Sequence, residues 1–546
     1  VGGISDWMTE MPFKDMMKNA RTWHTTNSAW VSGGKNQWDT DLMNSVALDE
    51  NGYPLEMPLT IASAETTQVV ETIWAVATGW PNGEYVVLYD GEGELNFGGT
   101  ITGVAAQGNG RMVFTFTGNG KDSQVYLKIK KSVKGNHIRN IRVLMPGTES
   151  SYVQQPFNPL WVERLKPFTT LRFMDWGKTN NWGEANAWEN YNEQSDTARV
   201  PWSKRSQPTH FTYANDKGVP YEMMIKAANT LKKDIWVCVP HNASDEYIDE
   251  MAKLFKAELD PSLKLYVEYS NEIWNWMFGQ AQWLNKFGCV DKGVSWPEGT
   301  VPYIQNVMDR FSSVYGNEKQ RIVRVVGVQV GWQDVAQRVV FNMREGSYDV
   351  YSPTAYFGFS EQADSALDAL GANATVQDVA HWARKTMYEH EFPQIQKVTS
   401  AITAKTGLPW VYYEAGNHLT NHPFGDAPTW EKALLELHRD TSIYNMYHEW
   451  FKLLETLNTG AQPHTYMNFS FIATRSARYG SWGVLETLDQ DTALIPAPKF
   501  KALSEYMQFC GKPNSSQTPA NPTGYDELYQ NYPNPFNPNT LIEFVL

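Results

Sequence analysis

The sequence is poor in cysteine and in charge and has no long apolar run, and each shortage excludes a class of protein. Among its 546 residues there are three cysteines, Cys238, Cys289 and Cys510, too few for a disulfide framework or a four-thiolate metal site. No apolar run reaches the roughly 18 residues that a membrane-spanning helix needs. The 46 Lys and Arg against 60 Asp and Glu give a net charge of −14, so we expect no basic surface for nucleic acid.

Aromatic side chains, in contrast, are abundant. They make up 13% of the residues while charged residues make up 19%, and the chain contains 22 tryptophans. This composition is typical of a globular chain with a substantial core and not of a disordered one. Tryptophan is costly to expose unless it stacks on a partner, and sugar rings are a common partner. At this length we expect two to four domains, from roughly 100–200 residues per domain.

The N-terminal third carries the two-residue period of β-strands. Apolar and polar residues alternate from Met112 to Thr117 and again from Val125 to Lys130, with Gly118-Asn119-Gly120 between them as a hairpin turn. Further glycine, aspartate and asparagine clusters punctuate residues 40–147. This pattern predicts an all-β, sandwich-like domain over residues 28–147.

From about residue 165 to 500 the pattern changes to short apolar runs separated by helical periodicity. The runs Ile235–Val239 and Leu265–Val267 lie about 30 residues apart, the length of one βα unit. Because no Gly-x-Gly-x-x-Gly motif follows a strand, a dinucleotide-binding sheet is not favoured. The predicted fold class is therefore α/β, a (β/α)₈ TIM barrel. Later strands are expected at residues 322–330, 348–356, 410–413 and 466–472.

The domain boundaries depend on where the first strand lies. Gly3 to Trp7 is a strand candidate, followed closely by a helical composition at residues 15–20. We therefore predict a discontinuous barrel, with the all-β domain inserted after its first helix; the alternative is a separate N-terminal domain before a barrel that starts near residue 165. The insert would be a carbohydrate-binding module, a lid or a buttress. The expected divisions are 1–27 and 148–510 for the barrel, 28–147 for the insert, and 511–546 for a Pro/Asn-rich linker ending in one truncated β-strand.

Two of the predicted strands end in a glutamate. Glu272 follows the apolar run at 265–267 in the sequence Asn-Glu-Ile-Trp, and Glu414 ends the strand that begins near Trp410. In a barrel both would lie at the carboxyl-terminal face, where active sites are built. Two carboxylates about 5–5.5 Å apart are what retaining glycoside hydrolysis requires. Glu268 lies on the same strand as Glu272, and we interpret it as a buried acid satisfied by its neighbours.

The segment from Tyr266 to Trp276 resembles the fourth-strand motif of the clan A glycoside hydrolases. These are retaining (β/α)₈ enzymes with an Asn-Glu pair after strand four and a nucleophilic glutamate after strand seven. The resemblance covers residues 1–27 and 148–510, and cellulase- and xylanase-like members are nearest. It implies that Glu272 is the acid/base, Asn271 its companion and Glu414 the nucleophile.

Further substrate-binding residues follow from the resemblance and from their place at strand ends. Tyr356 resembles the residue that hydrogen-bonds the nucleophile, Arg172 the arginine that orients it, and Trp482 the tryptophan beneath the central sugar. For Tyr356 a simple core-edge tyrosine is the alternative, and for Arg172 an ion pair inside the barrel wall. We also place His241, Trp274, Asp6 and Trp7 at the cleft as candidate substrate contacts.

The C-terminal segment from Tyr529 to Pro538 resembles the opening of the sorting domain used by bacterial type IX secretion. The resemblance implies a secreted or cell-surface bacterial protein that uses the type IX secretion machinery as a partner. Val1 to Ile4 has neither a basic nor an apolar region of a signal peptide, so the signal would have been removed or omitted.

Together these observations predict a retaining glycoside hydrolase that cleaves a β-linked plant-type polysaccharide such as cellulose, β-glucan or xylan. We expect endo action by double displacement and neither a metal nor an organic cofactor. The alternatives are an exo-acting glycosidase on the same scaffold and a non-catalytic glycan-binding surface protein. A metal-dependent hydrolase is disfavoured, because His418 and His422 lack an intervening glutamate directly after the first histidine and Pro423 interrupts any helix.

Overall fold

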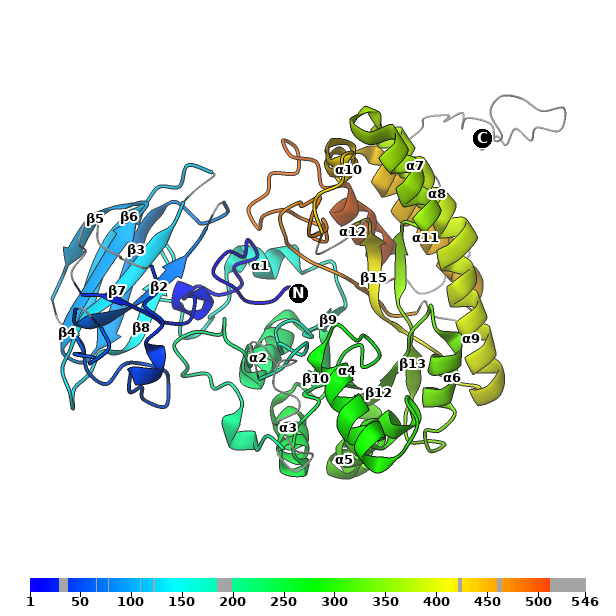
Figure 1. Cartoon of the computed structure of the whole chain (residues 1–546), viewed down its shortest axis with the longest axis horizontal. Coiled ribbons are helices and arrows are strands. Elements are labelled where there is room, and N and C mark those ends of the chain that lie inside the picture. The colour runs from blue at the N-terminus through cyan, green and yellow to red at the C-terminus, as the bar shows by residue number, and fades with distance from the viewer. Residues whose placement is uncertain are drawn as a thin grey trace.

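The computed structural model describes residues 1–28, 38–64, 66–76, 78–108, 110–120, 123–183, 199–420, 425–458 and 464–510. Figure 1 shows two lobes, one of antiparallel strands at the left and one of parallel strands and helices at the right. The expected linker and sorting tail at residues 511–546 lies outside the described residues. Within the described ranges, no helix is long and apolar enough to cross a membrane.

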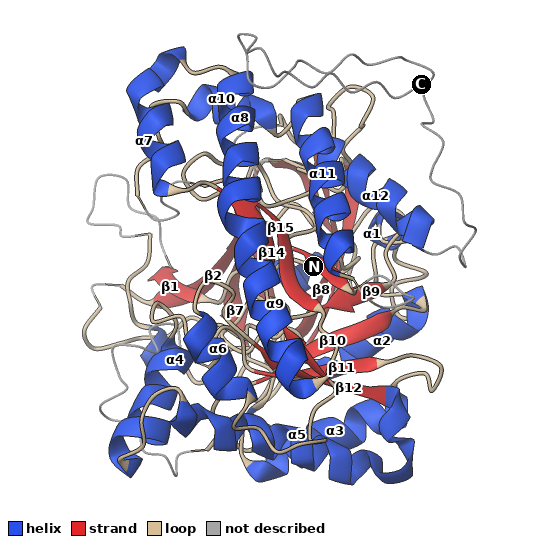
Figure 2. Cartoon of the chain, turned by 90° about the vertical axis from the view of Figure 1, so that its right-hand side faces the viewer, coloured by secondary structure: helices blue, strands red, loops and turns tan. Residues whose placement is uncertain are grey.

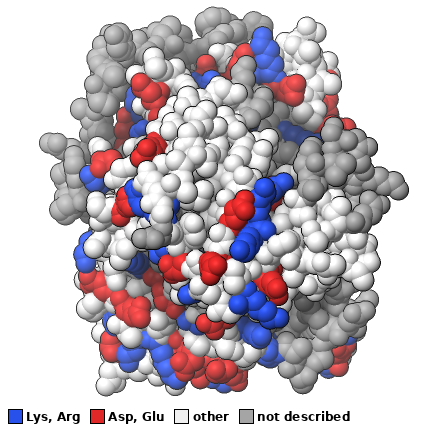
Figure 3. Space-filling model, turned by 90° about the vertical axis from the view of Figure 1, so that its left-hand side faces the viewer, with Lys and Arg blue, Asp and Glu red and all other residues white. Residues whose placement is uncertain are grey.

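The antiparallel lobe consists of two four-stranded sheets that share one core. The first has the order β1 (His24–Asn27), β2 (Gln68–Trp74), β7 (Val125–Ser132), β4 (Gly93–Gly99), and the second has the order β5 (Ile101–Ala106), β6 (Arg111–Phe116), β3 (Gly83–Asp90), β8 (Arg139–Leu144). Trp74 and Trp80 are buried in this core, so neither offers an open face to a sugar. Figure 3 looks onto this lobe and shows acidic and basic side chains intermixed on its surface.

The first residues of the chain do not form the strand and helix that the sequence predicts. Residues 1–5 have no regular structure, Asp6 and Trp7 lie in a turn, and residues 16–19 form only a 3₁₀ turn. The prediction of a strand at residues 3–7 is therefore wrong, because the Gly2 amide donates to Glu10 Oε2 (2.8 Å) in place of a ladder partner.

Most buried side chains between Met11 and Asn27 pack with the antiparallel sheets, whereas Phe13 packs in the core of the other lobe. Met11, Met16 and Trp23 lie in the core of the antiparallel lobe, and β1 pairs with β2. The sequence predicts that residues 1–27 belong to the barrel, but these three side chains and β1 pack in the antiparallel lobe, which was expected to begin at residue 28.

The second lobe contains two parallel sheets in chain order. The five-stranded sheet comprises β9 (Thr170–Arg172), β10 (Asp234–Val239), β11 (Leu265–Tyr269), β12 (Ile322–Gly327) and β13 (Val350–Ser352), and the three-stranded sheet comprises β14 (Ala355–Gly358), β15 (Tyr412–His418) and β16 (Tyr466–Asn468). A parallel bridge between Tyr351 and Trp410 joins the two sheets. They form the parallel part of the expected barrel, but the described residues do not close a ring of eight strands. A cavity of about 240 Å³ lies between β9 and β16.

Helices cover the outer face of these parallel strands, as Figure 2 shows for α3, α5, α6, α9 and α11. Ser244 caps α3 by accepting the Tyr247 amide, and Thr375 with Asp378 forms a capping box at α8, so local side chains fix these helix starts. The helices are α1 (Pro159–Arg164), α2 (Tyr221–Leu231), α3 (Asp245–Glu258), α4 (Gly279–Leu284), α5 (Val301–Tyr315), α6 (Gln333–Val340), α7 (Glu361–Leu370), α8 (Val376–Thr386), α9 (Phe392–Thr406), α10 (Glu431–Leu437), α11 (Thr441–Leu457) and α12 (Pro498–Cys510).

Trp161 on α1 offers a test of this packing. It is fully buried, stacks on Trp176 and Phe157, and donates its indole N–H to Glu10 Oε1 (2.8 Å). Trp161→Ala is expected to lower the free energy of unfolding by about 3–5 kcal/mol, because it leaves a large cavity. Urea unfolding followed by circular dichroism measures the change, and Trp38→Ala, at a side chain 48% exposed, should cost less than about 0.5 kcal/mol. Equal midpoints for the two variants would contradict this account.

Candidate active site

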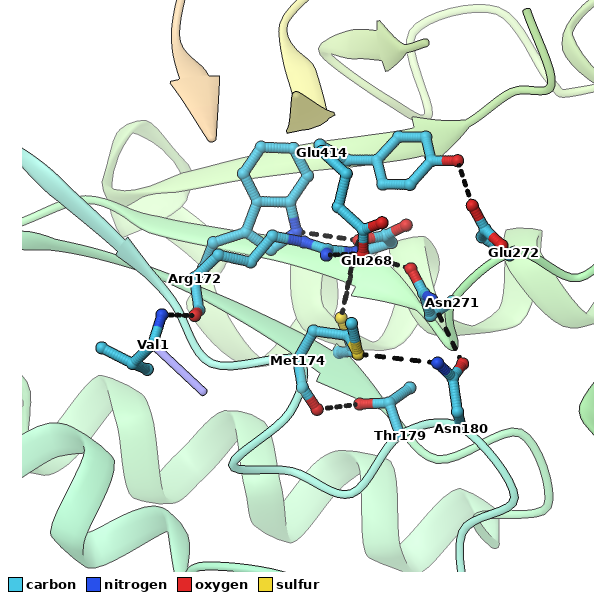
Figure 4. A network of polar contacts seen from close by, with 12 residues as sticks. Val1, Arg172, Met174, Thr179, Asn180, Glu268, Asn271, Glu272 and Glu414 are labelled. Carbon is cyan, nitrogen blue, oxygen red and sulfur yellow. Dashed lines mark hydrogen bonds and ion pairs between the residues drawn. The ribbon is translucent and has the colours of Figure 1, made fainter. Parts of the chain in front are cut away.

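Polar side chains from several parallel strands converge near one end of the sheets. Arg172 ends β9, Asn271 and Glu272 follow β11, Tyr356 lies on β14 and Glu414 on β15. The carboxyl ends of parallel strands share one edge, which is why residues so distant in sequence meet there. Figure 4 shows Glu268 and Glu414 at the end of the Arg172 side chain, with Glu272 to one side.

Arg172 is the centre of the cluster. Its Nη1 donates to Glu414 Oε1 at 2.8 Å, and its Nη2 donates to Glu268 Oε2 at 2.8 Å and to Asn271 Oδ1 at 2.9 Å. Its side chain is 6% exposed, so both ion pairs are shielded from water. One guanidinium therefore holds two carboxylates and one amide in fixed positions.

Both oxygens of the Glu414 carboxylate have a hydrogen-bond donor. Arg172 binds one, and the Tyr356 hydroxyl donates to the other, Oε2, at 2.9 Å. Burial raises the pKa of Glu414 to about 8, although the charge of Arg172 lowers it; the nearby charge of Glu272 raises it further. The carboxylate is thus fixed in orientation and electrostatically coupled to Glu272.

Glu272 is held by a different pair of donors. The Tyr413 hydroxyl donates to Oε1 and the Asn275 amide to Oε2, each at 2.9 Å. Glu272 is half-buried, in contrast to Glu414, which is 7% exposed. Its backbone has a φ of 41°, in the left-handed region, as does Ser270 with a φ of 56°. Non-glycine residues are rare there and cluster at functional sites.

A β-bulge in β15 brings two successive residues into this site. Neighbouring residues on a regular strand point to opposite faces, yet Tyr413 contacts Glu272 while Glu414 contacts Arg172. The pairing of β15 with β16 shifts register between Tyr412 and Ala415, and such bulges re-aim side chains next to active sites.

Asn271 is fixed on both sides of its amide. Its Oδ1 accepts from Arg172, and its Nδ2 donates to Asn180 Oδ1 at 3.1 Å. Gln280 in turn donates to Asn180 Oδ1 and to the Asn271 carbonyl. Asn271 is 2% exposed, so it braces Arg172 in this structure.

Trp482 lies beside the cluster. Its ring centroid is 6.1 Å from that of Tyr356 and 4.9 Å from that of His418, and its Nε1 donates to the Tyr479 carbonyl at 2.7 Å. Gly480, with a φ of 87°, passes so close that a Cβ would lie 2.4 Å from the indole nitrogen. Glycine is therefore required there to hold the indole next to Tyr356.

The other four residues predicted to bind substrate occupy varied positions, and their binding of substrate stays a prediction. Trp274 is 6% exposed and packs edge-on against Tyr413. His241 is buried against Trp283, and burial lowers its pKa to about 3. Asp6 is buried and paired with Arg21 at 2.7 Å, whereas Trp7 is 65% exposed.

Sequence reasoning missed several participants. From the sequence, no role was assigned to Tyr413 and Asn275, which bind Glu272, although Asn275 lies within the fourth-strand segment. None was assigned to Asn180, which braces Asn271. Glu268 accepts from Arg172, from Trp236 Nε1 (2.9 Å) and from Cys238 Sγ (3.5 Å), in agreement with its interpretation as a satisfied buried acid.

The described residues contain no group of three or more His, Cys, Asp or Glu side chains that could hold a metal ion. His422, one of the two histidines with metal-ligand spacing, lies outside the described residues. His418 packs against Trp482.

No family model and no curated protein matches the sequence. Among solved structures, a modular endo-β-1,4-mannanase from Cellulomonas fimi is similar, with 13% identity and a TM-score of 0.28 over 54% of this chain and 57% of the mannanase chain. A broad-specificity endoglucanase from Clostridium cellulovorans is similar with 11% identity and a TM-score of 0.32, over 63% of this chain and 96% of that one. Similarity this low leaves the function to be argued from the site.

Replacing Arg172 tests the charge balance of the cluster. Folding raises the pKa of Glu414 above its ordinary value of 4.5 to about 8, so ionising this group lowers stability as pH rises between those values. Arg172→Met removes the compensating charge and leaves two buried carboxylates unpaired. It is expected to cost about 3–5 kcal/mol at about pH 9 and less at about pH 5, as measured by urea unfolding.

Adding Glu268→Gln and Glu414→Gln to Arg172→Met serves as the control. This triple variant has no buried charge in the cluster and should recover part of the lost stability at alkaline pH. If the single variant lost the same stability at both pH values, the ion pairs would not be the cause.

Proposed function

We propose that the protein is a retaining glycoside hydrolase that cleaves a β-linked plant-type polysaccharide, such as cellulose, β-glucan or xylan, at internal bonds. The observation that carries this proposal is the unequal setting of two coupled carboxylates. Glu414 is buried and fixed through both oxygens by Arg172 and Tyr356. Glu272 is half-buried and bound by two neutral donors. The donors on Glu414 favour its ionised form and oppose the effect of burial on its pKa, as a nucleophile requires, while Glu272, with no cation among these hydrogen-bond donors, suits the acid/base.

The reaction proceeds in two displacements. Glu272 donates a proton to the glycosidic oxygen while a Glu414 oxygen bonds to the anomeric carbon, and the bond to the leaving sugar breaks. Water then attacks the same carbon, gives a proton to Glu272 and releases Glu414. No cofactor takes part in either step.

Arg172 has a second role in this scheme, through its bond to Glu268. When Glu414 forms the covalent intermediate, its negative charge disappears. Glu268 remains ion-paired with Arg172 at 2.8 Å, so the buried guanidinium stays neutralised and in place. Glu268 is thus a positioning residue that acts through Arg172.

We also propose that the protein is exported through the type IX secretion machinery. The proposal rests on the resemblance of residues 529–538 to the start of a sorting domain and implies a bacterial, secreted or surface-attached protein that meets its polysaccharide outside the cell.

Removing the nucleophile is the first test. Glu414→Ala is expected to lower the rate on polysaccharide and on aryl β-glycosides by at least about a thousandfold, because no covalent intermediate can form. Glu71→Gln is the matched control: Glu71 is also buried and paired, with Lys128 at 3.2 Å in the antiparallel lobe, and this variant should keep the rate. If wild-type protein bound glycan without releasing reducing sugar, the protein would be a glycan-binding protein and not a hydrolase.

Glu272 is tested with leaving groups of different acidity. Glu272→Gln should slow cleavage of polysaccharide by about 10²–10⁴-fold. A dinitrophenyl glycoside needs no protonation of its leaving group, so it should still give a rapid burst of dinitrophenol followed by slow turnover. Equal losses on both substrates, or inversion at the anomeric carbon by proton NMR, would contradict the assigned roles.

A further inference from the structure

Three tryptophans form a row on the surface beyond the two glutamates. The ring centroid of Trp296 lies 5.2 Å from that of Trp276 and 5.2 Å from that of Trp332. The two outer side chains are 43% and 45% exposed, respectively, and Trp296 is partly buried between them. We call these three residues the tryptophan row.

The tryptophan row begins next to the candidate active site. Trp276 follows Glu272 by four residues, and Trp296 lies in the same connection between β11 and α5. Trp332 immediately precedes α6, in the connection that follows β12. All three thus leave the carboxyl ends of adjacent parallel strands, the face on which the paired carboxylates lie.

The backbone beneath the row is held firmly. Arg338 on α6 donates to the Trp296 carbonyl at 2.8 Å and forms an ion pair with Glu298. Gln282 on α4 donates to the Trp276 carbonyl at 3.0 Å, and the Trp332 carbonyl accepts the Ala336 amide in the first turn of α6. The backbone that carries the exposed rings is therefore held in place, which lowers the entropy cost of binding a ligand.

Exposed indole faces at such a site fit sugar rings. The C–H faces of a pyranose ring are apolar and carry slight positive charge, which the negative face of an aromatic ring attracts. Neighbouring rings of the row are tilted by 44° and 47° to each other, so the three rings are not coplanar. Non-coplanar rings fit a single glycan chain better than the flat face of a crystal.

We propose that the tryptophan row binds successive sugar units on the leaving-group side of a single β-linked glycan chain. The inference rests on the proposed function, because the leaving-group side is defined by Glu272 as the proton donor. The row would hold the part of the chain that departs after the first displacement and so favour long soluble polymers over short substrates.

The test compares a polymer with a substrate that has no sugar on the leaving-group side. Trp276→Ala, Trp332→Ala and the double variant are assayed on hydroxyethyl cellulose and xylan, both largely uncharged, and on a nitrophenyl glycoside of a disaccharide. For the double variant we expect KM on the polymer that wild type cleaves to rise about tenfold. The ratio of polymer to nitrophenyl-glycoside kcat/KM should fall by a similar factor. Trp38→Ala, an equally exposed tryptophan of the antiparallel lobe, is the control and should leave the ratio unchanged.

Binding is measured separately from catalysis. Migration in native gels that contain hydroxyethyl cellulose or xylan should be retarded for wild type and less retarded for the double variant. Unchanged KM and unchanged retardation in an active double variant would overturn the inference and leave the proposed function standing. A wild type that hydrolyses no glycan but loses retardation in the double variant would overturn the proposed function, and the row would then be a glycan-binding surface without an assigned leaving-group side.

Discussion

Arg172 carries one positive charge and faces two carboxylates, and this imbalance organises the rim of the parallel sheets. Glu268 and Glu414 each form a 2.8 Å ion pair with it, and Tyr356, Trp236 and Cys238 donate further hydrogen bonds to the two carboxylates. Burying such a group is costly without full pairing. Tyr356 therefore satisfies the Glu414 oxygen that the arginine does not contact. Trp236 shares one Glu268 oxygen with the arginine, and Asn271 accepts from the guanidinium itself.

The same site shows what the sequence could and could not predict. Glutamates at the predicted ends of two apolar runs placed Glu272 and Glu414 at one rim, because parallel strands end together, although β15 continues beyond Glu414 to His418. The family resemblance also paired Arg172 with the nucleophile Glu414, and the structure has that ion pair together with one to Glu268 inside the barrel wall. Tyr413 was not predictable: it precedes Glu414 directly, and strict alternation would send it to the other face. Only the bulge in β15 turns it towards Glu272, and a bulge has no signature in this stretch of sequence.

The fold was predicted in its periodic parts and missed where periodicity is weak. Alternation gave the antiparallel strands, and continuous apolar runs gave the parallel ones. The expected strand at residues 3–7 did not form: Asp6 and Trp7 lie in a turn, and the amide of the preceding Gly2 binds Glu10. The methionines at 11, 16 and 17 have no strand or helix period, so nothing in the sequence assigned them to the core of the antiparallel lobe.

The contact between the lobes decides whether the antiparallel lobe is complete on its own. Phe211, from the connection that precedes α2, stacks on Trp23 at a centroid distance of 4.9 Å, and the Tyr213 amide donates to the Lys18 carbonyl at 2.9 Å. The segment around Phe211 and Tyr213, which belongs to the lobe of parallel strands, thus completes the packing of the antiparallel lobe. Cutting the chain between the lobes would remove Phe211 from Trp23 and expose an aromatic surface in that core. The antiparallel lobe is therefore not self-contained, because part of its core comes from residues 211–213.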